Sequence, residues 1–132
     1  TLEETKNICE QTKQHLEQLL SDLKTGSLEE LRSRKDSIRD AISGMEALMK
    51  NITDEDDIKD ADKKLRNDED WGRKFILKDG ISIWNSIHRF YTDVRHGHPE
   101  VIDISKDEAI YWIERIMVFI NYLVKKYNQN KN

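Results

Sequence analysis

Apolar residues in the first half of the chain follow the three- and four-residue spacing that is typical of amphipathic helices. A first helix is predicted from Leu2 to Lys24. Its apolar side consists of Leu16, Leu19, Leu20 and Leu23. Thr25 and Gly26 are expected to end this helix, and Ser27 with Glu30 has the spacing of a capping box that starts the next one.

The second predicted helix has a heptad stripe with one lysine in it. The stripe contains Leu28, Leu31, Lys35, Ile38, Ile42, Met45, Met49 and Ile52. Two helices of this length joined by a tight turn predict an antiparallel hairpin. We expect the stripe to be buried against the first helix, as core or as a dimer seam.

The segment from Thr53 to Asp70 is rich in Asp and Lys. Its few apolar residues are Ile58, Ala61 and Leu65. This composition fits either a short solvated helix or an acidic linker. The acidic run from Asp54 to Asp57 favours a helix N-terminus, where carboxylates complement the helix dipole. A calcium loop is disfavoured because its glycine and terminal glutamate are absent.

A third helix is predicted to begin near Asp79, in a stretch that turns apolar from Trp71 onward. The residues expected on its apolar face are Phe75, Ile76, Ile81, Trp84, Ile87, Phe90, Tyr91 and Val94. Gly97 and Pro99 predict a break in the helix between Arg95 and Ser105.

The last predicted helix follows an extended connection from Val101 to Ile104 and is capped by Ser105 with Glu108. It is apolar around nearly its whole circumference. The residues concerned are Ala109, Ile110, Trp112, Ile113, Ile116, Met117, Phe119, Ile120, Leu123 and Val124. Such a helix is expected at the centre of a bundle or in an interface with a second subunit.

Composition agrees with this pattern. The 132 residues include one proline and five glycines, and we predict a single all-α domain spanning residues 1–132. We expect a four- or five-helix bundle that begins with the antiparallel helical hairpin. The start at Thr1 and the polar tail suggest the C-terminal part of a longer protein.

Charge and cysteine content narrow the function classes. The 22 basic and 26 acidic side chains give a net charge of −4, which argues against a general electrostatic grip on nucleic acid but leaves a local basic site open. Cys9 is the single cysteine, so no internal disulfide is expected. No secretory signal or membrane span is recognisable, so a cytoplasmic protein without membrane contact is the expectation.

The stretch from Arg89 to Pro99 gathers candidate chemistry at the predicted helix exit. It contains Arg89, Arg95, His96 and His98. Metal-independent RNA cleavage requires a base with a pKa near neutrality for the ribose 2′-OH and a fixed cation beside the phosphate. Histidine and arginine supply these two groups.

Two helices that bracket such an Arg/His-rich loop resemble the HEPN superfamily, whose hallmark is an Arg followed four to six residues later by a His. Six residues separate Arg89 from His96. The run Asp93 to Pro99, followed by Glu108, Ala109 and an aliphatic helix, is also similar to abortive-infection C-terminal domains of that superfamily. The resemblance covers residues 79–127. Phe90 follows Arg89 where the family often has a polar residue.

The resemblance implies a metal-independent ribonuclease or RNA-binding effector in anti-phage or toxin-antitoxin defence, with no cofactor. His96 would be the acid/base residue, Arg89 or Arg95 the phosphate clamp, and His98 an assistant. It further implies a homodimer in which two motifs face one cleft.

Other interpretations of the same residues stay open. Arg89 and Arg95 would otherwise form ion pairs with Asp93, Glu100 or Asp103, with the histidines as solvated cap residues. Zinc binding by His96 and His98 with these carboxylates is disfavoured, because no cysteine or third histidine lies nearby. We therefore expect no metal.

A different class of function is a non-catalytic helical module that binds a protein partner through the heptad hairpin and the acidic middle. Trp71, Trp84 and Trp112 would be a stacking platform for bases, but burial in the core explains them with fewer assumptions.

Overall fold

The computed structural model describes residues 2–25, 31–91 and 104–130, and all regular structure within these ranges is helical. The elements are α1 (Leu2–Lys24), α2 (Leu31–Thr53), α3 (Ile58–Arg66), the 3-10 turn η1 (Glu69–Trp71), α4 (Lys74–Phe90) and α6 (Lys106–Asn130). The predicted all-α bundle is confirmed, and the first helix has the predicted bounds.

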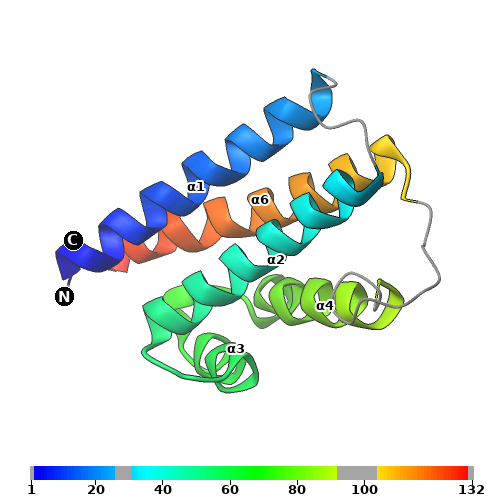
Figure 1. Cartoon of the computed structure of the whole chain (residues 1–132). Coiled ribbons are helices and arrows are strands. Elements are labelled where there is room, and N and C mark those ends of the chain that lie inside the picture. The colour runs from blue at the N-terminus through cyan, green and yellow to red at the C-terminus, as the bar shows by residue number, and fades with distance from the viewer. Residues whose placement is uncertain (1, 26–30, 92–103, 131–132) are drawn as a thin grey trace.

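Three long helices form one part of the bundle. α1 and α2 run antiparallel as a hairpin, and α6 lies along both of them, antiparallel to α1 (Figure 1). α3 and α4 pack against the second half of α2, and α4 also contacts α6. α6 contacts α1, α2, η1 and α4, and α2 contacts α1, α3, α4 and α6, so these two helices form the centre of the described structure.

The apolar stripe of α2 is buried inside the chain, as predicted. Ile38, Ile42, Met45 and Met49 are at most 3% exposed. Ile52 is partly buried against the same core, whereas the side chain of Leu31 lies outside the described part of the structure. Because α2 contacts both α1 and α6, the stripe serves as core of this bundle.

The acidic middle forms a short helix, which was one of the two alternatives. Asp57 is the N-cap of α3, and its carboxylate accepts the Lys59 backbone N–H at 2.7 Å. The predicted anchors Ile58, Ala61 and Leu65 are buried. Just before it, Asp54 adopts a left-handed φ of 58° and Glu55 N–H donates to the Lys50 carbonyl, so α2 ends in a Schellman-type motif.

The predicted start of the third helix was wrong, because α4 begins at Lys74 and not near Asp79. Gly72, with φ of 98°, reverses the chain after η1, and Arg73 is extended at φ −73° and ψ 135°. The backbone geometry after Gly72 thus starts the helix without a side-chain cap, and such a start has no cap signature in the sequence.

The predicted apolar face of this helix was also partly wrong. Phe75 and Phe90 are 72% and 61% exposed, whereas Leu77 and Ile83 are fully buried. Ile87 and Tyr91 are buried as expected. The buried residues of the longer helix are Leu77, Gly80, Ile83 and Ile87, and Phe75 lies off that line. Phe90 continues the spacing, but it is the last residue of α4 and is exposed there.

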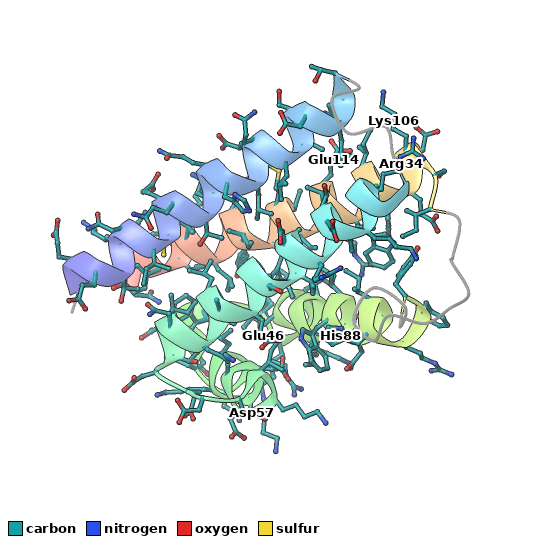
Figure 2. The ribbon with its side chains drawn as sticks, viewed as in Figure 1. Arg34, Glu46, Asp57, His88, Lys106 and Glu114 are labelled. Atoms are coloured by element: carbon teal, nitrogen blue, oxygen red, sulfur yellow. The ribbon has the colours of Figure 1, made fainter. Side chains whose placement is uncertain are left out.

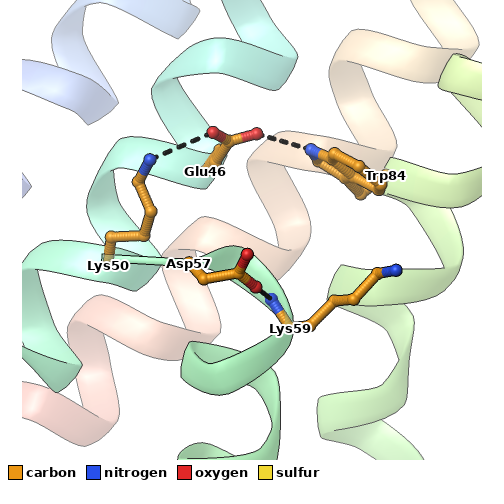
Figure 3. A network of polar contacts seen from close by, with 5 residues as sticks. All are labelled: Glu46, Lys50, Asp57, Lys59 and Trp84. Carbon is orange, nitrogen blue, oxygen red and sulfur yellow. Dashed lines mark hydrogen bonds and ion pairs between the residues drawn. The ribbon is translucent and has the colours of Figure 1, made fainter. Parts of the chain in front are cut away.

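α4 is joined to α2 by a polar contact. The Trp84 indole N–H donates to Glu46 Oε1 at 2.6 Å, and Glu46 Oε2 accepts from Lys50 at 3.2 Å (Figure 3). The carboxylate is only partly exposed, so both of its oxygens are satisfied where water has limited access. This contact sets how α4 lies across α2.

Gly80 allows α4 to approach α6 closely. A Cβ built on Gly80 would lie 2.7 Å from two ring atoms of Phe119, whereas Phe119 itself is 4% exposed and has little room to move. Gly44 in α2 is different, because its Cβ would meet Thr12 at an ordinary 3.7 Å. The two glycines therefore give opposite expectations for the same substitution.

We expect Gly80→Ala to lower the free energy of unfolding by about 1–3 kcal/mol, because a methyl group overpacks the α4–α6 contact. The matched control Gly44→Ala should be neutral or stabilising by about 0.4–1 kcal/mol, since alanine is favoured inside a helix. Urea denaturation of both variants provides the measurement. Equal stability of the two variants would contradict the close approach at Gly80.

Candidate functional site

Arg89 lies in the last turn of α4 and is exposed to solvent. Its guanidinium carbon is 5.3 Å from the centre of the Phe90 ring, a cation–π arrangement. Within residues 2–25, 31–91 and 104–130, Arg89 makes no ion pair. A cation at a helix C-terminus also interacts favourably with the helix dipole.

The other predicted site residues, Arg95, His96 and His98, lie outside the described part of the structure. The same holds for Asp93, Glu100 and Asp103, on which the ion-pair and zinc alternatives depended. Among the described residues, no group of three His, Cys, Asp or Glu side chains is arranged to hold a metal ion.

Tyr91, directly after Arg89 and Phe90, attaches the end of α4 to α6. Its hydroxyl donates to Glu108 Oε1 at 2.7 Å and accepts the Trp112 indole N–H at 3.0 Å. The Tyr91 and Trp112 rings meet edge to face with centroids 6.1 Å apart. Tyr91 is 7% exposed, so its hydroxyl is satisfied by two hydrogen bonds in a partly buried contact. α4 ends here, and a separate helix begins at Lys106.

Ile104 and Ser105 are held on the other side of residues 92–103. Ile104 is fully buried, and its carbonyl accepts a hydrogen bond from Arg34 Nη1 at 3.1 Å. Ser105 Oγ accepts the Glu108 backbone N–H at 3.1 Å, which confirms the predicted cap of the last helix. The Glu108 carboxylate accepts the Tyr91 hydroxyl, so it joins the end of α4 to the start of α6.

Arg89 and the start of α6 consequently lie at the same end of the bundle. Figure 2 shows Arg34 and Lys106 close together where α2 and α6 begin, with His88 on α4 below them. Of the four predicted site residues only Arg89 lies in the described part of the structure, and no pattern in the sequence indicated Arg34 as a support. The Tyr91–Glu108 pair was also missed, since it joins residues from different helices.

Burial raises the pKa of the Tyr91 hydroxyl, and the hydrogen bond to the Glu108 carboxylate raises it further. The hydrogen bond from Trp112 acts in the opposite direction with a smaller effect. Tyr91 therefore remains a neutral donor over the whole physiological range of pH. Its role is to position the helix end that carries Arg89.

His88 packs inward and is distinct from the predicted site. Its ring lies edge to face with Trp84, with centroids 3.9 Å apart, and it is partly buried. The spacing of four residues between Trp84 and His88 places both on one side of α4.

The three tryptophans belong to the packed part of the structure. Trp71 is 9% exposed, and Trp84 and Trp112 are partly buried with their indole N–H groups bonded to Glu46 and Tyr91. The interpretation as core residues is confirmed. None of the described helices contains an apolar stretch that would cross a lipid bilayer.

Comparisons with protein-family models, with curated proteins and with solved structures found no match for this chain. The resemblance to the HEPN superfamily therefore stays a prediction.

Replacing Tyr91 by Phe should lower the free energy of unfolding at neutral pH by about 1–3 kcal/mol, because Glu108 and Trp112 lose a buried partner. A raised pKa in the folded state means that the proton on Tyr91 stabilises the fold below the unfolded pKa of about 10. That stabilisation is lost as the pH rises through the folded pKa.

The difference in unfolding free energy between wild type and Tyr91→Phe should therefore shrink above about pH 10. Denaturation at neutral and at high pH measures it, and both proteins share every other titrating group. A difference that grows with pH would contradict the environment assigned to Tyr91.

Proposed function

We propose that this protein is a HEPN-like, metal-independent ribonuclease or RNA-binding effector of cellular defence that acts on single-stranded RNA in the cytoplasm. The observation that carries the proposal is the placement of Arg89. It is exposed in the last turn of α4, and the adjacent Tyr91 is fixed to α6 by two hydrogen bonds. A cation whose backbone is held in this way suits the binding of a phosphate.

The chemistry requires no metal or cofactor. His96 would take the proton from the ribose 2′-OH as its oxygen attacks the adjacent phosphorus. The bond from phosphorus to the 5′ oxygen then breaks, and His98 would give a proton to that leaving oxygen. The products are a 2′,3′-cyclic phosphate and a 5′-hydroxyl end. Arg89, with Arg95, would balance the negative charge that grows on the phosphate oxygens.

Phe90 supports single-stranded RNA as the substrate class. It is 61% exposed, and the guanidinium carbon of Arg89 lies 5.3 Å from the centre of its ring. An aromatic ring next to a phosphate-binding cation is the arrangement that stacks an unpaired base while the backbone is held. The net charge of −4 leaves RNA binding to such local contacts.

The partners in this proposal are RNA and a second copy of the chain. The resemblance implies that two Arg/His motifs share a cleft. A non-catalytic interaction module remains the alternative function, but the α2 stripe expected to recruit its partner is already buried within this chain. Such a module would have to bind through the acidic middle, which was the second surface expected for it, or through another surface.

Arg89→Ala and His96→Ala should each abolish RNA cleavage while helical content is preserved. Loss of an acid/base residue typically reduces the rate by about a hundred- to ten-thousandfold. The test incubates purified protein with single-stranded RNA in a chelator and maps 2′,3′-cyclic phosphate ends. Arg73→Ala is the matched control, because Arg73 is exposed at the opposite end of α4 and makes no side-chain cap bond. Inert wild-type protein would reject catalysis.

Phe90→Ala should raise the KM for single-stranded RNA by roughly five- to 150-fold and leave kcat nearly unchanged, because a stacked base contributes about 1–3 kcal/mol of binding. Phe90→Trp should restore binding. The matched control is Phe75→Ala, since Phe75 is 72% exposed at the other end of the same helix. Equal effects of the two alanine variants would remove Phe90 from the site.

A further inference from the structure

The outer side of the α4–α6 contact carries apolar side chains that the bundle leaves open. Val118 and Tyr111 on α6 are 70% and 52% exposed. They border a groove of about 340 Å³, whose floor includes Ile83 of α4 and Phe119 of α6. Exposed apolar surface that continues into a groove typically marks an interaction site.

The residues expected to make a subunit interface are mostly used inside the chain. Ile113, Ile116, Ile120, Leu123 and Val124 are at most 4% exposed, and they pack in the core. The interior of the bundle therefore explains most of the apolar character of α6. Only a narrow outer face, with Tyr111 and Val118, remains to be explained.

This outer face is complementary to itself. Tyr111, Glu114, Arg115 and Val118 follow at the spacing that places residues on one side of a helix, and all four border the groove. Consider a two-fold axis that passes midway between residues 114 and 115 and pairs α6 with an antiparallel α6. Tyr111 then meets Val118 of the second copy, and Glu114 meets Arg115 of the second copy.

The same two contacts recur on the other side of the axis, as an isologous interface requires. One is an apolar pair, and the other is a pair of opposite charges. A shift of the axis by one residue would remove the Glu114–Arg115 match. A partner of unrelated sequence would not require this symmetry, so the complementarity favours a second copy as the occupant.

Glu114 and Arg115 could exchange their present contacts within the chain for contacts with a second copy. Glu114 pairs with Lys24 at 3.5 Å, but both side chains are about half exposed, at 50% and 52%, so this ion pair contributes little. Arg115 Nη1 donates to the Tyr111 hydroxyl at 3.3 Å, and its guanidinium carbon lies 5.5 Å from the Trp112 ring. These contacts keep Arg115 on the groove side of α6.

We propose that a second copy of this chain occupies the groove, with the two α6 helices antiparallel about an axis between residues 114 and 115. The proposal does not depend on the ribonuclease chemistry, since it concerns a surface formed by described residues of α4 and α6. Because a second copy is also a partner in the proposed function, a monomeric wild type would reject that partner as well, whereas RNA cleavage by Arg89 and His96 is tested by a separate measurement.

Sedimentation equilibrium of the full chain, up to high micromolar concentration, tests the proposal. Wild type should be a dimer. Val118→Asp should be a monomer because it places a charge in the apolar pair, and Arg115→Glu should be a monomer because carboxylates then face one another. The double exchange Glu114→Arg with Arg115→Glu should restore the dimer, since opposite charges again meet in this register.

Arg39→Glu is the charge-matched control, because Arg39 is exposed on α2 and forms an ion pair with Asp36 one turn away on the same helix. It should leave the dimer unchanged. Circular dichroism confirms that each variant is folded. A monomeric wild type, or dimeric Val118→Asp and Arg115→Glu variants, would overturn the proposed interface. If Arg115→Glu is monomeric and the double exchange Glu114→Arg with Arg115→Glu is monomeric too, the proposed register is overturned.

Discussion

The arrangement of the whole bundle depends on the burial of α6 on more than one side. α6 has more apolar surface than one neighbouring helix can cover, so α1 and α2 pack on it from one direction and α4 from another. Apolar burial stabilises by roughly 25 cal/mol for each Å² removed from water, which makes this the dominant favourable contribution. The packing of α4 on α6 requires a glycine at position 80, because a side chain there would meet the ring of Phe119.

The candidate site is located where this packing ends. α4 stops at Phe90, and the next residue is held by the carboxylate of Glu108 and the indole of Trp112, both on α6. A buried hydroxyl that both donates and accepts loses little on leaving water, but it is costly if either partner is removed. The end of α4 is therefore positioned by a polar contact at the edge of the apolar core. This contact also positions Arg89, because Arg89 lies in the last turn of α4.

α6 consequently takes part in both proposed surfaces. Its first two turns, through Glu108 and Trp112, support the helix end that carries Arg89 and Phe90. Its outer face, around Glu114 and Arg115, borders the groove assigned to a second copy. Both surfaces belong to one helix whose remaining sides are buried in the core. A change in the packing of α6 would therefore alter the position of both surfaces.

Local chemistry in the sequence was sufficient to predict the all-α class, the bounds of α1, the buried stripe of α2 and the Ser105 cap, because each depends on residues a few positions apart. For the segment from Thr53 to Asp70 it left a helix and a linker as alternatives, and the structure decided for the helix α3. The sequence also identified Arg89 as a candidate, since its type and spacing are readable directly. Tertiary structure alone decided that α4 starts at Lys74 and that Phe75 and Phe90 are exposed. It also decided that Tyr91, Glu108 and Arg34 hold the end of the bundle. Those features arise from contacts between distant segments, and no local pattern encodes which segments will meet.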